Sequence, residues 1–124
     1  MYLDWLNRTA DLSQPLRGLR AGAPDVMKAF AAMSQAALKT NALDSKTKEL
    51  IALAIGVATR CDDCIAFHAK AAIDRGATRE EIMETLGLAI YMGAGPSVMY
   101  ASHAAEAAEQ IMTAKMATPP PAQD

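Results

Sequence analysis

The chain has 124 residues, 52% of them apolar, and a formal net charge of −2 at pH 7. A chain of this length accommodates one domain, which we expect to span residues 1–116. No cluster of Lys and Arg marks a phosphate-binding face, so a nucleic-acid partner is not expected. The apolar residues are mostly Ala, Leu, Ile and Met, with few aromatics, a composition that favours helices. We therefore predict an all-α fold.

The N-terminal part of the chain predicts two helices. Residues 2–20 are helical in pattern, with a weak point at Pro15, whose ring removes one backbone donor. A break is expected at residues 21–23. Pro24 suits the first position of the next helix, which we expect to run to about Lys39.

The next expected helix, residues 46–59, follows a turn at 41–43 and a cap at Asp44 or Ser45. It is apolar around nearly its whole circumference after Glu49. A helix without a polar face is buried on all sides. We therefore expect residues 50–58 to be buried on all sides.

Three further helices are expected, at residues 61–74, 78–92 and 96–115. Gly76 is a typical left-handed stop for the first of them, and Thr78 with Glu81 has the spacing of a capping box for the second. The total is a bundle of about six helices. The Pro-rich residues 117–124 predict a disordered tail.

The uncharged stretch from Thr85 to Ser102 is about long enough to span a bilayer. Residues 93–96, Gly-Ala-Gly-Pro, would leave backbone groups unpaired in lipid, so we expect two helix ends meeting in a dry environment and no membrane span. No secretory signal is visible at the N-terminus, which favours a cytoplasmic location. The apolar surface exceeds what one small bundle can bury, so self-association is expected.

Cys61 and Cys64, the only two cysteines, are followed by His68. In a reducing compartment a CxxC pair is more often catalytic or metal-binding than structural. A closed zinc site would have to use both cysteines, His68 and the distant His103. A chance pair of buried cysteines is the other alternative, and a redox pair is the interpretation that we favour.

The spacing suits thiol chemistry. At the first turn of a helix, Cys61 and Cys64 lie on one face, where free N–H groups and the helix dipole stabilise a thiolate. Arg60 adds a positive charge, whereas the two aspartates between the cysteines oppose it. A base that removes the thiol proton is then useful, and His68 lies on the same face of the helix as the two cysteines. The helix start favours Cys61 as the attacking thiol, adjacency to His68 favours Cys64, and we prefer Cys64.

Glu49 precedes an almost wholly apolar run, so its carboxylate has two possible roles. It is either solvated and paired with Lys46 or Lys48, or buried and orienting His68. Its spacing from those residues does not decide between the two.

These residues resemble the alkylhydroperoxidase D-like proteins of the carboxymuconolactone decarboxylase superfamily. The resemblance rests on Glu49, the apolar run 50–58, and Cys61-x-x-Cys64-x-x-x-His68. It extends over roughly residues 20–115, and its further matches are Ala71-Ala72, the turn Gly76-Ala77-Thr78 with Glu80-Glu81, and the segment Gly93–Tyr100. It differs at Asp63, where the best-known peroxidase members have a further histidine. The decarboxylase branch typically lacks the cysteine pair.

The resemblance implies an all-helical subunit in a homotrimer or homohexamer. It also implies a proton relay of Glu49, Cys61, Cys64 and His68, in which the cysteines cycle between dithiol and disulfide. The expected function is a thiol-dependent antioxidant oxidoreductase of peroxiredoxin type. It would reduce hydroperoxides, use no bound cofactor and be regenerated by an external dithiol or thiol protein. A redox sensor, a non-enzymatic oligomeric module and a lactone decarboxylase are the alternatives.

Overall fold

The structure, a computed structural model, describes residues 1–117. They form six helices: α1 (Trp5–Asp11), α2 (Ser13–Gly22), α3 (Pro24–Leu38), α4 (Ser45–Ala58), α5 (Asp62–Asp74) and α6 (Arg79–Ala117). No strand occurs in the described residues, and the predicted all-α fold is confirmed. The tail that we expected after residue 116 lies, from residue 118 onward, outside the described residues.

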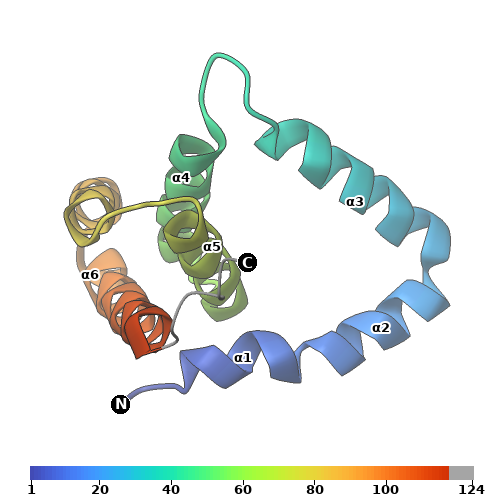
Figure 1. Ribbon diagram of the computed structural model, residues 1–124, viewed down its shortest axis with the longest axis horizontal. Coiled ribbons are helices and arrows are strands. Elements are labelled where there is room, and N and C mark those ends of the chain that lie inside the picture. Colours follow the sequence, from blue (N-terminus) through green and yellow to red (C-terminus); the bar gives the residue numbers. More distant parts are fainter. Residues whose placement is uncertain (118–124) are drawn as a thin grey trace, which may run out of the picture.

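Helices α4, α5 and α6 pack against one another, and α1 lies across α5 and α6 (Figure 1). Helices α2 and α3 extend away from this group and return to it through the loop before α4 (Figure 1). Neither α2 nor α3 contains a buried residue. The body of the molecule is thus formed by α1, α4, α5 and α6, with α2 and α3 as an arm.

Local signals set several helix ends. The Asp44 side chain caps α4 by accepting a hydrogen bond from the backbone N–H of Thr47 at 2.7 Å. At the start of α6, the Thr78 N–H donates to Glu81 at 2.9 Å and the Glu81 N–H donates to the Thr78 hydroxyl at 3.1 Å, so the predicted capping box is formed. Gly76 has φ 93°, the left-handed conformation expected after α5.

Of the two interruptions in the N-terminal part, the first falls earlier than the expected weak point at Pro15, and the second falls within the expected residues 21–23. The chain divides α1 from α2 at Leu12, and Pro15 lies in the first turn of α2, where its missing N–H costs no helix bond. Gly22 is still helical, and the break before α3 is at Ala23, with φ −133° and ψ 61°. Pro24 begins α3 as predicted.

The predicted break in the uncharged stretch of α6 is present. Ala94 has φ 55° and ψ −140°, so α6 consists of two helices that meet at a kink. The expected dry environment is wrong for the single chain, because Tyr91 just before the kink is 80% exposed. None of the helices within residues 1–117 is long and apolar enough to cross a membrane.

The core is formed by small and branched apolar residues from α1, α4, α5 and α6. Its largest fully buried side chains are Trp5, Leu53, Val57, Ile65 and Ile82. Within the single chain, α4 is not buried on all sides as expected. Helices α5 and α6 cover only the part of its circumference that includes Leu53 and Val57, while Ile55 is 56% exposed. An apolar groove of about 410 Å³ runs along this uncovered side, between α4 and α6.

Candidate active site

The two cysteines form a disulfide at the start of α5. Their Cα atoms lie 5.2 Å apart. Cys61 is the N-cap residue, and its sulfur accepts a hydrogen bond from the Cys64 N–H at 3.1 Å. Both sulfurs therefore lie where the first N–H groups and the positive end of the α5 dipole favour an anion.

The C-terminal end of α4 holds this motif in place. The Cys61 N–H donates to the Gly56 carbonyl at 3.0 Å. A Cβ atom on Gly56 would lie only 3.2 Å from the Cys64 Cβ, so glycine lets α4 approach the cysteines closely. Arg60 makes the turn between the helices with φ 58°. Gly56 was not among the predicted site residues, although a glycine inside an apolar helical pattern is a sign of close packing or function.

Glu49 and His68 form a pair between α4 and α5. The carboxylate oxygen of Glu49 lies 2.7 Å from the His68 Nδ1 atom. The Glu49 side chain is 3% exposed and that of His68 30% exposed. Of the two roles considered for Glu49, the structure thus has the buried carboxylate that contacts His68, and the alternative pairing with Lys46 or Lys48 does not occur.

Cys64, His68 and Glu49 line one cavity of about 700 Å³. Its other walls come from three helices and include both apolar and polar side chains. They are Leu16, Arg20, Met27, Phe30, Ala31, Ser34, Gln35, Asp63, Phe67 and Ala71. The arm formed by α2 and α3 therefore lines one side of a cavity at the start of α5 that also contains a disulfide cysteine, a base and a buried carboxylate.

His103 does not join this group. Its ring stacks on that of Tyr2, with centroids 3.7 Å apart, whereas His68 pairs with Glu49. Among the described residues, no group of three or more His, Cys, Asp or Glu side chains is placed to hold a metal ion. The four side chains that a closed zinc site would need are therefore not gathered.

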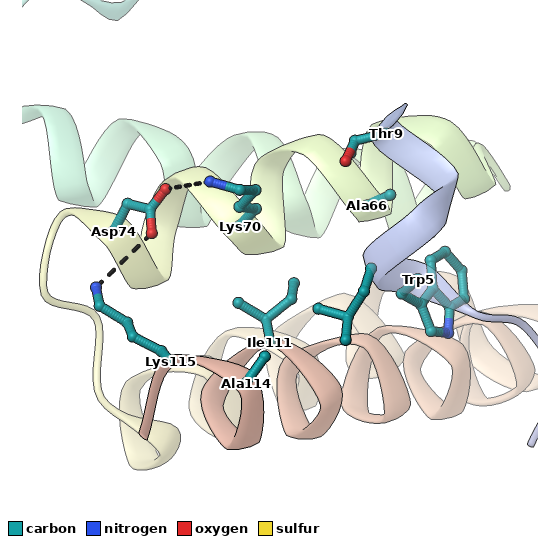
Figure 2. Close-up of a pocket in the computed structure, with 9 residues that line it drawn as sticks. Trp5, Thr9, Ala66, Lys70, Asp74, Ile111, Ala114 and Lys115 are labelled. Carbon is teal, nitrogen blue, oxygen red and sulfur yellow. Dashed lines mark hydrogen bonds and ion pairs between the residues drawn. The ribbon is translucent and has the colours of Figure 1, made fainter. Parts of the chain in front are cut away.

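A smaller cavity of about 300 Å³ lies between α1, α5 and α6 (Figure 2). Its charged side chains pair with one another: Asp74 contacts Lys70 at 2.7 Å and Lys115 at 3.7 Å. None of the predicted site residues lines it. The cavity beside Cys64 is therefore the better candidate active site.

The family model and the solved structures that match this chain name one family. The carboxymuconolactone decarboxylase family model matches residues 24–107. An uncharacterized protein of Cupriavidus necator is 39% identical over 104 residues, which cover 84% of this chain and 92% of that protein. A carboxymuconolactone decarboxylase family protein of Legionella pneumophila has a solved structure with a TM-score of 0.83 and 48% identity, covering 86% of this chain and 96% of that one.

A second solved structure, of a family member from Thermotoga maritima, is 28% identical with a TM-score of 0.79. It covers 86% of this chain and 92% of that one, and a role in the antioxidative response has been suggested for that protein.

Proposed function

Because the chain belongs to the carboxymuconolactone decarboxylase family and has its disulfide beside a Glu–His pair, we propose that it is a thiol-dependent antioxidant oxidoreductase that reduces hydroperoxides. One observation carries the proposal: Cys64, His68 and Glu49 line the same cavity. A thiol, a base within reach of it and a group that orients the base are the components of an activated nucleophile. The role suggested for the Thermotoga maritima relative supports the same chemistry.

The proposed reaction begins with the dithiol form. His68 takes the proton of the Cys64 thiol, and the thiolate attacks one peroxide oxygen. The O–O bond breaks, the alkoxide takes the proton from His68 and leaves as an alcohol, and Cys64 becomes a sulfenic acid. The Cys61 thiol then attacks the Cys64 sulfur, the S–O bond breaks and water leaves. The product is the disulfide that the structure contains.

Two features favour Cys64 as the attacking thiol. Cys64 lines the cavity together with the base, whereas Cys61 is not one of the lining residues. Cys61 is the N-cap of α5, and its sulfur is already close to Cys64. This placement suits the thiol that resolves the sulfenic acid.

We further propose that an external dithiol or thiol protein reduces the disulfide, in the cytoplasm and without a bound cofactor. The reductant gives up two electrons and two protons and is itself oxidised to a disulfide. The apolar faces that α3, α4 and α6 leave exposed support assembly into a homotrimer or homohexamer.

The test has two parts. Multi-turnover reduction of cumene hydroperoxide is measured with dithiothreitol as reductant, and Cys64→Ser is expected to lose it. Cys61→Ser, reduced, desalted and given one equivalent of peroxide, is expected to stop at a sulfenic acid that dimedone traps on Cys64. Undiminished turnover by Cys64→Ser would overturn the proposal. Dimedone trapped on Cys61 in Cys64→Ser, with none on Cys64 in Cys61→Ser, would reverse the two roles.

A further inference from the structure

The N-terminal segment contacts both residues that lie between the cysteines. The Tyr2 hydroxyl donates a hydrogen bond to Asp62 at 3.2 Å. The Arg8 Nε atom donates to Asp63 at 2.6 Å. Each aspartate that opposes a thiolate at the start of α5 is therefore engaged by a residue more than fifty positions away in the sequence.

This segment is firmly attached to α6. Glu106 accepts hydrogen bonds from the Tyr2 N–H at 2.7 Å and from the Trp5 indole N–H at 2.8 Å. Gln110 accepts from the Trp5 N–H at 2.8 Å. The Trp5 side chain, 1% exposed, is part of the core. Arg8, one turn further along α1, therefore has a fixed position from which to reach Asp63.

Arg8 changes the electrostatics of the cysteine pair. An unpaired Asp63 carboxylate beside Cys64 would counteract the helix dipole, because a nearby like charge disfavours an anion. The Arg8 guanidinium offsets that charge, and the hydrogen bond to Asp63 raises the pKa of Arg8 above its already high value. Arg8 thus stays charged at every pH at which a thiol titrates.

We propose that Arg8 is a positioning residue of the redox pair, which neutralises Asp63 and so favours the thiolate over the thiol. The proposal rests on the proposed function only in taking Cys61 and Cys64 as a redox pair. A more stable thiolate stabilises the reduced form, so Arg8 also makes the disulfide easier to reduce.

Other charged and titratable groups face the same region and stay unchanged in the test. Glu49 and His68 pair with each other, and Tyr2 donates to one carboxylate oxygen of Asp62, whose other oxygen is buried without a hydrogen-bond partner among the described residues. Besides Arg8 and Asp63, these groups are Tyr2 before α1, Arg20 on α2, Glu49 on α4, Arg60 before α5, and Asp62 and His68 on α5. On α3, the polar residues that line the cavity are Ser34 and Gln35, neither of which titrates.

The test compares Arg8→Gln with Arg17→Gln, which removes the same charge from an exposed position on α2. The first measurement is the pH midpoint of iodoacetamide alkylation of the reduced protein. Arg8→Gln is expected to raise this midpoint by about half a pH unit. Arg17→Gln and Arg8→Lys, which keeps the charge, are expected to leave it unchanged.

The second measurement is the equilibrium with oxidised and reduced dithiothreitol at a pH above the midpoint. Arg8→Gln is expected to shift it about threefold toward the protein disulfide, which corresponds to about 14 mV. Asp63→Asn can still accept the hydrogen bond from Arg8 but has no charge, so it is expected to shift both measurements the other way. The double variant is expected to return close to the wild type.

An Arg8→Gln midpoint equal to that of Arg17→Gln would overturn the proposal and leave Arg8 a structural tether, detected only as a lower melting temperature. If Arg8→Gln does not fold by circular dichroism, an Asp63→Asn midpoint that is not lowered overturns it instead. Both measurements detect thiols rather than peroxide turnover. A protein without peroxidase activity would therefore still give a result, and failure of the proposed function is distinguishable from failure of this one.

Discussion

The pair formed by Glu49 and His68 allows a sharp prediction. Glu49→Gln keeps the shape of the side chain but removes the charge that holds the imidazole at 2.7 Å. A hydrogen bond to a charged group is worth about 1.5–3 kcal/mol. If that energy orients the base in the transition state, its loss slows oxidation of the thiol about 10- to 100-fold.

His68→Ala removes the base itself, and we expect a loss at least as large near neutral pH. The loss should shrink as the pH approaches about 8.5, where an unassisted thiol ionises. This variant also leaves the buried Glu49 carboxylate without its partner, at a cost of about 1–3 kcal/mol in the free energy of unfolding. Urea unfolding measures that cost, so a fold defect is separable from a rate defect.

The decisive test is the double variant that combines Glu49→Gln with His68→Ala. Because Glu49 acts only through His68 in this account, Glu49→Gln should slow the His68→Ala protein little further. The assay is oxidation of the reduced protein by hydrogen peroxide, followed by stopped flow. Glu80→Gln, at an exposed position on α6, is the matched control and should react like the wild type. Additive losses from the two single changes would refute the relay.

Three further predictions concern stability and assembly. Gly56→Ala should lower the melting temperature, because the added Cβ would lie 3.2 Å from the Cys64 Cβ. Gly87→Ala, with open space around it, should instead gain up to about 1 kcal/mol in the free energy of unfolding, measured by urea titration. Equal effects of the two substitutions would refute this. The indole N–H of Trp5 and backbone N–H groups hold the pKa of Glu106 below its ordinary 4.5, so this stabilisation is complete above pH 4.5 and is lost as the pH falls through the lowered pKa. An acid titration of the fluorescence of the single tryptophan measures it, and a signal that changes only between pH 5 and 7 would contradict it. Light scattering at micromolar concentration should give three or six times the subunit mass, because burial of the exposed apolar faces of α3, α4 and α6 favours association. The mass of one subunit would refute the assembly.

The local chemistry of the sequence predicted much of the fold. The Thr78–Glu81 capping box, Pro24 at the start of α3 and the break before Pro96 each depend on residues within one or two turns of a helix. The shared stripe of Cys64 and His68 likewise follows from helical spacing. Such features need no knowledge of the tertiary structure, because their partners are close in the sequence.

Features that depend on packing between distant helices could not be predicted in this way. The exposed side of α4 is apolar, and nothing in its own pattern tells which side α5 and α6 will cover. The contact of Arg8 with Asp63 joins residues 55 positions apart, on helices brought together by the burial of Trp5. The position of α2 and α3 over Cys64 is of the same kind, since neither helix has a buried residue that would indicate where it packs.

The central claim is that Cys61 and Cys64 form a peroxide-reducing dithiol, and its most direct test is oxidation of the reduced wild-type protein by cumene hydroperoxide in a stopped-flow instrument. We expect a rate far above that of free cysteine at the same pH, and a product that mass spectrometry identifies as the disulfide between the two residues. Oxidation as slow as that of free cysteine would contradict the claim and leave the disulfide as a sensor or a structural link.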